Sequence, residues 1–201
     1  MGDEKIKLMS IEEIETGWDS MTEDERNSVC AYQKLDTKFL TKHIKEVNWS
    51  LISINPATLT FEILDKFPSK ISWSSICFNP KPVSESLMYN YRARMHWYLL
   101  LSHQKLSPRF LVIMSEVYRK SRAKNGKDFW DAVCRYAEID CDYVDAYKRF
   151  INFRELSMNP NITPKTIDKY IMKLDPSLLM KSIDIPADLL LKYRDYFKNA
   201  K

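Results

Sequence analysis

Hydrophobic positions recur along the chain in a degenerate pattern. Three tryptophans lie 24 residues apart, and each is followed three residues later by an aliphatic side chain (Trp49/Ile52, Trp73/Ile76 and Trp97/Leu100). Residues 151–160 match residues 47–56 position by position, with Phe153 in the place of the tryptophan. A fixed period of this length is typical of stacked supersecondary units. The pattern therefore predicts a repeat protein.

Each repeat contains two sequence patterns that predict the start of a helix. A first set places an apolar residue before a good N-cap and another four residues after it, with caps at Asp36, Thr60, Ser84, Ser107 and Thr163. A second set has the caps Asn48, Ser72, Asn152 and Asp175, whereas His96 replaces the good cap in the third repeat. Asn-Pro pairs soon after the second starts keep those helices short. We expect an all-α, solenoid-like array of stacked short helices, in which Trp49, Trp73, Trp97 and Phe153 are buried at equivalent places.

The repeat pattern is interrupted in the middle of the chain. Here the sequence predicts a helix continuing to Tyr118, a basic turn over 119–127, a capped helix over 128–138 and another helix from Asp140. We interpret the chain as a single repeat domain, 1–201. It comprises an acidic lead-in (1–22), repeats (23–111), inserted helices with the basic turn (112–150) and further repeats (151–198), the last of which closes with one helix ending at Lys198.

Composition narrows the function classes. Only three glycines are present, so no glycine-rich phosphate loop can be formed, and we expect no cofactor. The four cysteines form no CxxC pair, which favours reduced thiols in the cytoplasm. No run of 18 apolar residues exists, so no membrane span is expected.

Catalytic and metal-binding patterns are weak. There are three histidines (His43, His96 and His103), and no nearby acids complete a ligand set, so no metal site is expected. No nucleophile elbow or Cys–His signature is present. The paired acids Asp140/Asp142 and Glu12/Glu13 fall at helix starts, where the helix dipole favours them without catalysis. The sequence predicts a protein that is not an enzyme.

Charge is distributed unevenly. Residues 1–35 carry nine acids and four bases, whereas residues 92–127 carry nine bases and one acid, Glu116. We predict a basic surface that binds an acidic partner protein, formed by Arg92, Arg94, Arg109, Arg119, Lys120, Arg122, Lys124 and Lys127. A merely solvated face is the plainer interpretation of such a run. Nucleic acid is the alternative partner, because the bases alternate with Tyr89, Tyr91, Trp97, Tyr98, Phe110 and Tyr118.

Two segments of the sequence resemble repeats of known proteins. Residues 32–40 and 103–111, each beside a W-x-x-I-S-like segment, resemble repeats found in proteins of tailed bacteriophages and large DNA viruses. The resemblance covers about 23–111 and 151–197 and supplies no catalytic motif. It implies a viral accessory protein in the cytoplasm of an infected cell, which binds and modulates or inhibits a host protein during host takeover. Transcription machinery and a defence component are equally admissible as that partner.

Overall fold

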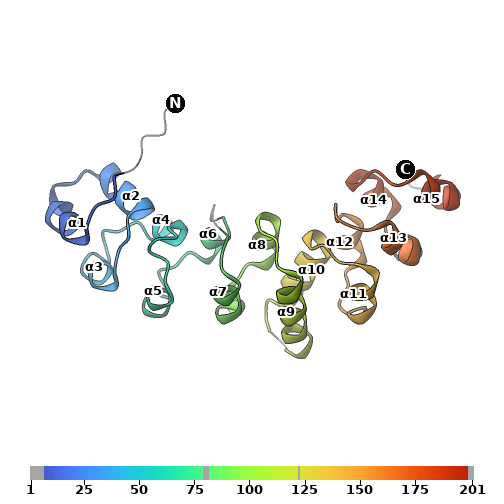
Figure 1. The fold of residues 1–201 in the computed structure, drawn as a ribbon, viewed down its shortest axis with the longest axis horizontal. Coiled ribbons are helices and arrows are strands. Elements are labelled where there is room, and N and C mark those ends of the chain that lie inside the picture. Colours follow the sequence, from blue (N-terminus) through green and yellow to red (C-terminus); the bar gives the residue numbers. More distant parts are fainter. Residues whose placement is uncertain (1–6, 79–81, 122, 199–201) are drawn as a thin grey trace. The chain divides into compact units, whose positions relative to one another are not determined.

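The computed structural model describes residues 7–78, 82–121 and 123–198, and within these ranges the chain is all-α, with no strand (Figure 1). The all-α prediction is confirmed. The chain divides into two compact units, residues 1–87 and 88–201, and each is described by itself below. The expectation of a single domain over 1–201 stays a prediction.

Unit 1 contains short helices only. These are α1 (Ile11–Gly17), the 3-10 turn η1 (Trp18–Ser20), α2 (Glu23–Tyr32), α3 (Thr37–Lys42), α4 (Trp49–Ile54), α5 (Phe61–Lys66) and α6 (Trp73–Cys77). The next helix, α7 (Glu85–Asn90), spans the boundary between the units.

Unit 2 contains the longest helices. They are α8 (Trp97–His103), α9 (Pro108–Lys120), α10 (Gly126–Tyr136), α11 (Cys141–Ala146), α12 (Phe153–Ser157), α13 (Pro164–Tyr170), α14 (Pro176–Ser182), α15 (Ala187–Lys192) and α16 (Arg194–Lys198). Two 3-10 turns, η2 (Arg92–Arg94) and η3 (Ile171–Lys173), complete it. The prediction of a single last helix ending at Lys198 is wrong, because the helix is interrupted at Tyr193, between α15 and α16.

The helices begin where their caps predict. In the first set, each side-chain oxygen accepts a hydrogen bond from the backbone N–H three residues on, over distances of 2.7 to 3.4 Å (Asp36, Thr60, Ser84, Ser107 and Thr163). The second set (Asn48, Ser72, Asn152 and Asp175) caps its helices in the same way. These bonds satisfy backbone donors that a helix start leaves unpaired. Local sequence thus fixes where each short helix starts.

Alternate helices stack on one another. In unit 1, α4 packs against both α2 and α6, and α3 packs against α5. In unit 2, α8, α10, α12, α14 and α16 pack in that order, and α11 packs against α13. The segment 112–150, which the sequence analysis interprets as inserted helices, thus contributes to the stack itself. It holds α10, which packs between α8 and α12.

A buried asparagine links one repeat to the next in each unit. The Asn55 Nδ2 group donates to the carbonyls of Cys30 (2.9 Å) and Gln33 (2.7 Å) at the end of α2. In unit 2, Asn159 Nδ2 donates to the carbonyls of Cys134 and Ala137, both at 2.9 Å. The Asn-Pro pair therefore has a second role besides ending a helix.

A small polar side chain makes a further link between repeats. Ser53 Oγ accepts from the backbone N–H of Ser72 (2.9 Å), and Ser157 Oγ accepts from that of Asp175 (2.7 Å). At the same position in α10, Cys134 Sγ accepts from Asn152 N at 3.3 Å. In these three helices, serine or cysteine directly follows a buried aliphatic residue (Ile52, Val133 and Leu156) and accepts this hydrogen bond.

The aromatic residues of the repeat do not share one environment. Trp97 is fully buried, at 0% exposure. Trp49, Trp73 and Phe153 are only half-buried, so the expectation that all four are buried is wrong for these three. The buried position common to the repeats is instead the following aliphatic, since Ile52, Ile76, Leu100 and Leu156 are all at most 1% exposed.

Candidate binding surface

Helix α9 carries three of the predicted basic residues. Ser107 caps it and Pro108 occupies its first position, where a missing N–H costs nothing. One face, with Phe110, Leu111, Met114, Ser115 and Tyr118, is buried. Because the helix turns once per 3.6 residues, the opposite face presents Arg109, Arg119 and Lys120 to solvent.

Glu116 neutralises part of this charge. Arg119 donates to it through Nη2 (2.5 Å) and Nε (3.1 Å), and Lys120 Nζ lies 3.8 Å from its carboxylate. These bonds, above all those from Arg119, hold the pKa of Glu116 below its usual value. Tyr147 of the α11 end donates to the same carboxylate at 3.0 Å. The only acid of residues 92–127 therefore joins α9 to the next repeat.

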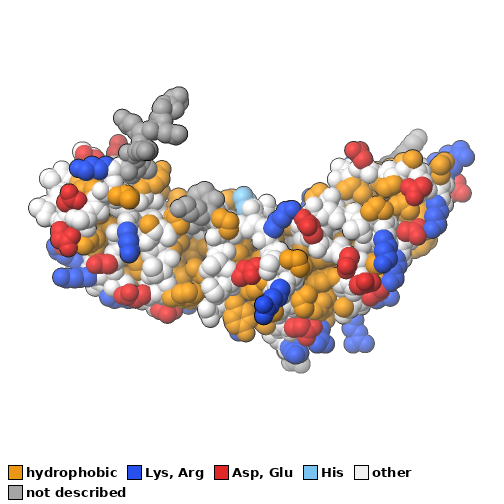
Figure 2. Space-filling view, in the orientation of Figure 1, with side chains coloured by type: hydrophobic (Ala, Val, Ile, Leu, Met, Phe, Trp, Pro, Cys, Tyr) orange, Lys and Arg blue, Asp and Glu red, His pale blue; other side chains and the backbone are white. Residues whose placement is uncertain are grey.

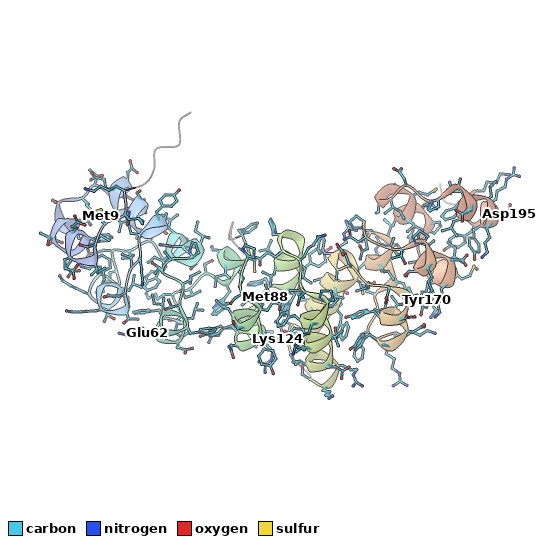
Figure 3. All side chains as sticks on the ribbon, viewed as in Figure 1. Met9, Glu62, Met88, Lys124, Tyr170 and Asp195 are labelled. Carbon is cyan, nitrogen blue, oxygen red and sulfur yellow. The ribbon has the colours of Figure 1, made fainter. Side chains whose placement is uncertain are left out.

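The turn between α9 and α10 holds the remaining bases of the cluster. Lys124 is exposed (labelled in Figure 3), and Lys127 forms an ion pair with Asp131 one turn along α10. Arg122 lies outside the described residues. Among the described residues, neither Lys124 nor Arg109 is in an ion pair.

The 3-10 turn η2, which contains Arg92 and Arg94, contacts this turn through the backbone carbonyl of Arg92. The Arg92 carbonyl accepts hydrogen bonds from Asn125 Nδ2 (2.7 Å) and from the Tyr118 hydroxyl (3.0 Å). The Arg92 side chain bends back, donating to the Tyr89 carbonyl at 2.8 Å, with its guanidinium carbon 5.0 Å from the Tyr89 ring centre. The structure thus brings η2 beside the turn, while Arg109 lies at the far end of α9.

Two basic residues that the sequence analysis did not select complete the surface. Lys148 and Arg149, both exposed, follow α11 and line an open groove together with Arg119, Asp145 and Tyr147. In Figure 2, blue side chains lie beside orange and red ones around the lower ends of α9 and α11. The signal of Lys148 and Arg149 in the sequence is the Lys-Arg pair before Phe150, which lies beyond the basic run of residues 92–127. We call Arg92, Arg94, Arg109, Arg119, Lys120, Lys124, Lys127, Lys148 and Arg149 the basic surface.

Asp128 does not cap its own helix, contrary to the prediction. Helix α10 begins two residues earlier, at Gly126, and Asp128 Oδ2 accepts from the backbone N–H groups of Trp97 (2.7 Å) and Tyr98 (3.4 Å). These are the first residues of α8, whose own N-cap residue, His96, makes no side-chain cap hydrogen bond. An acid from the next repeat therefore supplies the missing cap.

We expect Asp128→Ala to destabilise the protein by about 1 kcal/mol, since cap removal costs about 0.5 to 2 kcal/mol. Replacing His96 with Asn would restore a local cap, so His96→Asn should recover much of that loss in the Asp128→Ala background. Urea denaturation of the single and double variants measures this. If His96→Asn changes the free energy of unfolding by the same amount in the parent and in the Asp128→Ala background, the capping role of Asp128 is contradicted.

The aromatics interleaved with the bases are mostly structural. Trp97, Phe110 and Tyr118 are at most 6% exposed, and Trp97 Nε1 donates to the Tyr118 hydroxyl at 2.6 Å. Tyr98 donates to Glu155 at 3.1 Å. Only Tyr89, at 41% exposure, presents a large part of its ring to solvent. Few of the six aromatic residues are therefore placed to stack on bases.

The cysteines, His43 and one acid of each pair considered above as chemical groups are buried or form structural hydrogen bonds. Burial raises the pKa of the Cys134 thiol to about 12 and raises that of Cys30, which opposes thiolate formation at neutral pH. His43 is buried in unit 1, with Nδ1 3.2 Å from Glu46. Asp140 caps α11, and Glu13 completes a capping box with Ser10.

Within the three described ranges, no group of three metal-ligating side chains is close enough to hold an ion. Among those same residues, no helix has both the length and the apolar character needed to cross a membrane. No protein-family model, curated protein or solved structure matches the chain. The fold and the surface define an all-α helical-repeat protein with a basic patch on unit 2.

Proposed function

We propose that this protein is a non-enzymatic binding protein that docks on an acidic surface of another protein through its basic surface. The observation that supports this most is the groove where exposed bases of two separate segments meet, Arg119 of α9 with Lys148 and Arg149 after α11. Complementary charge accelerates association and selects partners. The resemblance to viral repeats adds the setting, a viral accessory protein that modulates a host protein in the cytoplasm of the infected cell.

Nucleic acid is the second candidate partner, because the same bases could contact phosphates. It is disfavoured by the burial of Trp97, Phe110 and Tyr118, which leaves little aromatic surface for stacking. Capture from host lysate with and without nuclease separates the two candidates. One stoichiometric protein that survives nuclease supports the first, and loss of all captured material supports the second.

Charge reversal tests the surface itself. Arg109, Lys124 and Arg149 are exposed, and replacing them with Glu breaks no ion pair within the described part of the chain. We expect the triple variant to associate with the captured protein at least about tenfold more slowly at low salt, because steering is screened over about 8 Å at physiological ionic strength. Its melting temperature should stay nearly unchanged, since exposed charges contribute little to folding.

The matched control reverses Lys34, Lys38 and Lys45 of unit 1, all three of which are exposed. It changes the net charge equally but leaves the basic surface intact. Stopped-flow association rates over a salt series compare the three proteins. Equal slowing in both variants would mean that only net charge matters, and no slowing in either would remove the basic surface as the binding site.

A further inference from the structure

The solvent-facing side of α9 carries two exposed branched aliphatics. Val112 is 48% exposed and Ile113 is 41% exposed. The core side of the same helix is complete without them, since Phe110, Leu111 and Met114 are at most 6% exposed. The two side chains therefore contribute little to the core that α9 forms with its neighbours.

The repeat shows that the fold does not require aliphatics at these positions. Val112 and Ile113 are the fifth and sixth residues after the cap Ser107. The same positions of the other first-set helices each contain at least one polar residue: Thr41-Lys42, Asp65-Lys66, Tyr89-Asn90 and Asp168-Lys169. The same holds for α11, which Asp140 caps, at Asp145-Ala146. Only α9 places two branched aliphatics there, on the longest helix of the chain's described part.

Basic residues lie at both ends of the stripe that contains Ile113, with Glu116 between Ile113 and the second of them. At 3.6 residues per turn, Arg109, Ile113, Glu116 and Lys120 follow one stripe, about 16 Å long at 1.5 Å per residue. Arg109 lies one turn before Ile113, and Lys120 lies two turns after it. The charge of Glu116 is balanced by its contacts with Arg119 and Lys120, so the stripe keeps a net positive charge.

We propose that α9 docks an acidic amphipathic helix of the partner, with aliphatic side chains on Val112 and Ile113 and carboxylates toward Arg109 and Lys120. This rests on the proposed function and specifies the chemistry of the partner. Amphipathic helices are recognised through apolar anchors spaced by one turn. Nucleic acid would use the charges but gains little from two exposed aliphatics, so the apolar pair favours a protein segment.

Two synthetic peptides serve as probes. One is a helix of about four turns with Leu along one face and Glu elsewhere, and the other replaces every Leu with Gln. By fluorescence anisotropy at low salt, the parent protein should bind the Leu peptide about tenfold more tightly than the Gln peptide, which corresponds to about 1.4 kcal/mol. Val112→Ser with Ile113→Ser should abolish this preference and leave the binding of the Gln peptide unchanged.

Leu191→Ser is the matched control, because Leu191 of α15 is 77% exposed and lies outside α9. It should keep the preference for the Leu peptide, and circular dichroism melts verify that each variant is folded. If the serine double variant keeps the preference, or if the parent shows none, the α9 inference is overturned. The proposed function is decided separately, by the effect of charge reversal on the captured protein. A single-stranded oligonucleotide that binds the parent while neither peptide does would overturn both.

Discussion

Trp97→Ala should destabilise the protein by about 3 to 5 kcal/mol, the usual cost of removing a large buried aromatic side chain. Trp97 is fully buried in unit 2, with its ring edge against Tyr118 and Phe129 at centroid distances of 5.9 and 5.2 Å. Its Nε1 also donates to the Tyr118 hydroxyl at 2.6 Å. The substitution removes this packing and leaves the buried hydroxyl with one partner fewer. Denaturant unfolding followed by circular dichroism measures the loss.

Trp49→Ala is the matched control, because Trp49 holds the same position of the repeat in unit 1. Its ring is half-buried against Phe67 (5.0 Å), and its Nε1 donates to the Ile44 carbonyl at 3.1 Å. We expect a loss of about half that of Trp97→Ala, since less apolar area returns to water. Equal losses at the two positions would contradict the difference in burial.

Asn159→Ala should cost about 2 to 3 kcal/mol, because it leaves one buried and one partly buried carbonyl without their shared donor. Those carbonyls belong to Cys134 and Ala137 at the end of α10, and Asn159 itself is fully buried. The side chain also accepts from the backbone N–H of Asn161 at 2.7 Å, which shapes the turn after α12. Unfolding free energies in urea measure the effect.

The repeat supplies an internal test of this link. Asn55→Ala removes the equivalent bonds in unit 1, to Cys30 and Gln33, and should cost a similar amount. Asn161→Ala is the local control, since its side chain makes one weaker contact, to the Tyr136 carbonyl at 3.2 Å. A loss at Asn161 as large as that at Asn159 would show that the turn as a whole matters and not the buried amide.

Helix positions could be predicted from the sequence because capping is local. A Ser, Thr, Asp or Asn followed four residues later by an aliphatic satisfies a helix start with atoms only a few residues apart, as at Asp36 and Leu40 or Asn152 and Leu156. The all-α class follows from many such starts in short helices with no alternating strand pattern. These features depend on neighbours in the chain, and the structure confirms them.

Contacts between repeats were decided only by the tertiary structure. Asp128 has the local pattern of a cap for its own helix, yet its carboxylate reaches the start of α8, 31 residues earlier. Helix α10 departs from the repeat's sequence but still lies between α8 and α12, because an apolar face can pack without keeping the aromatic signature. The equal spacing of Trp49, Trp73 and Trp97 likewise does not determine how far each ring is buried, because burial depends on residues distant in the chain.

The candidate surface shows the same division. The excess of basic residues in α9 and the turn after it is visible in the sequence, so the sequence predicts a basic surface there. Pairing of Arg119 with Glu116, and the arrival of Lys148 and Arg149 from the end of α11 at the same groove, depend on which helices become neighbours. The sequence by itself therefore determined the helices, their caps and the charge bias. The tertiary structure decided which charges meet, which rings are buried and which aliphatics remain exposed, because these depend on distances between residues far apart in the chain.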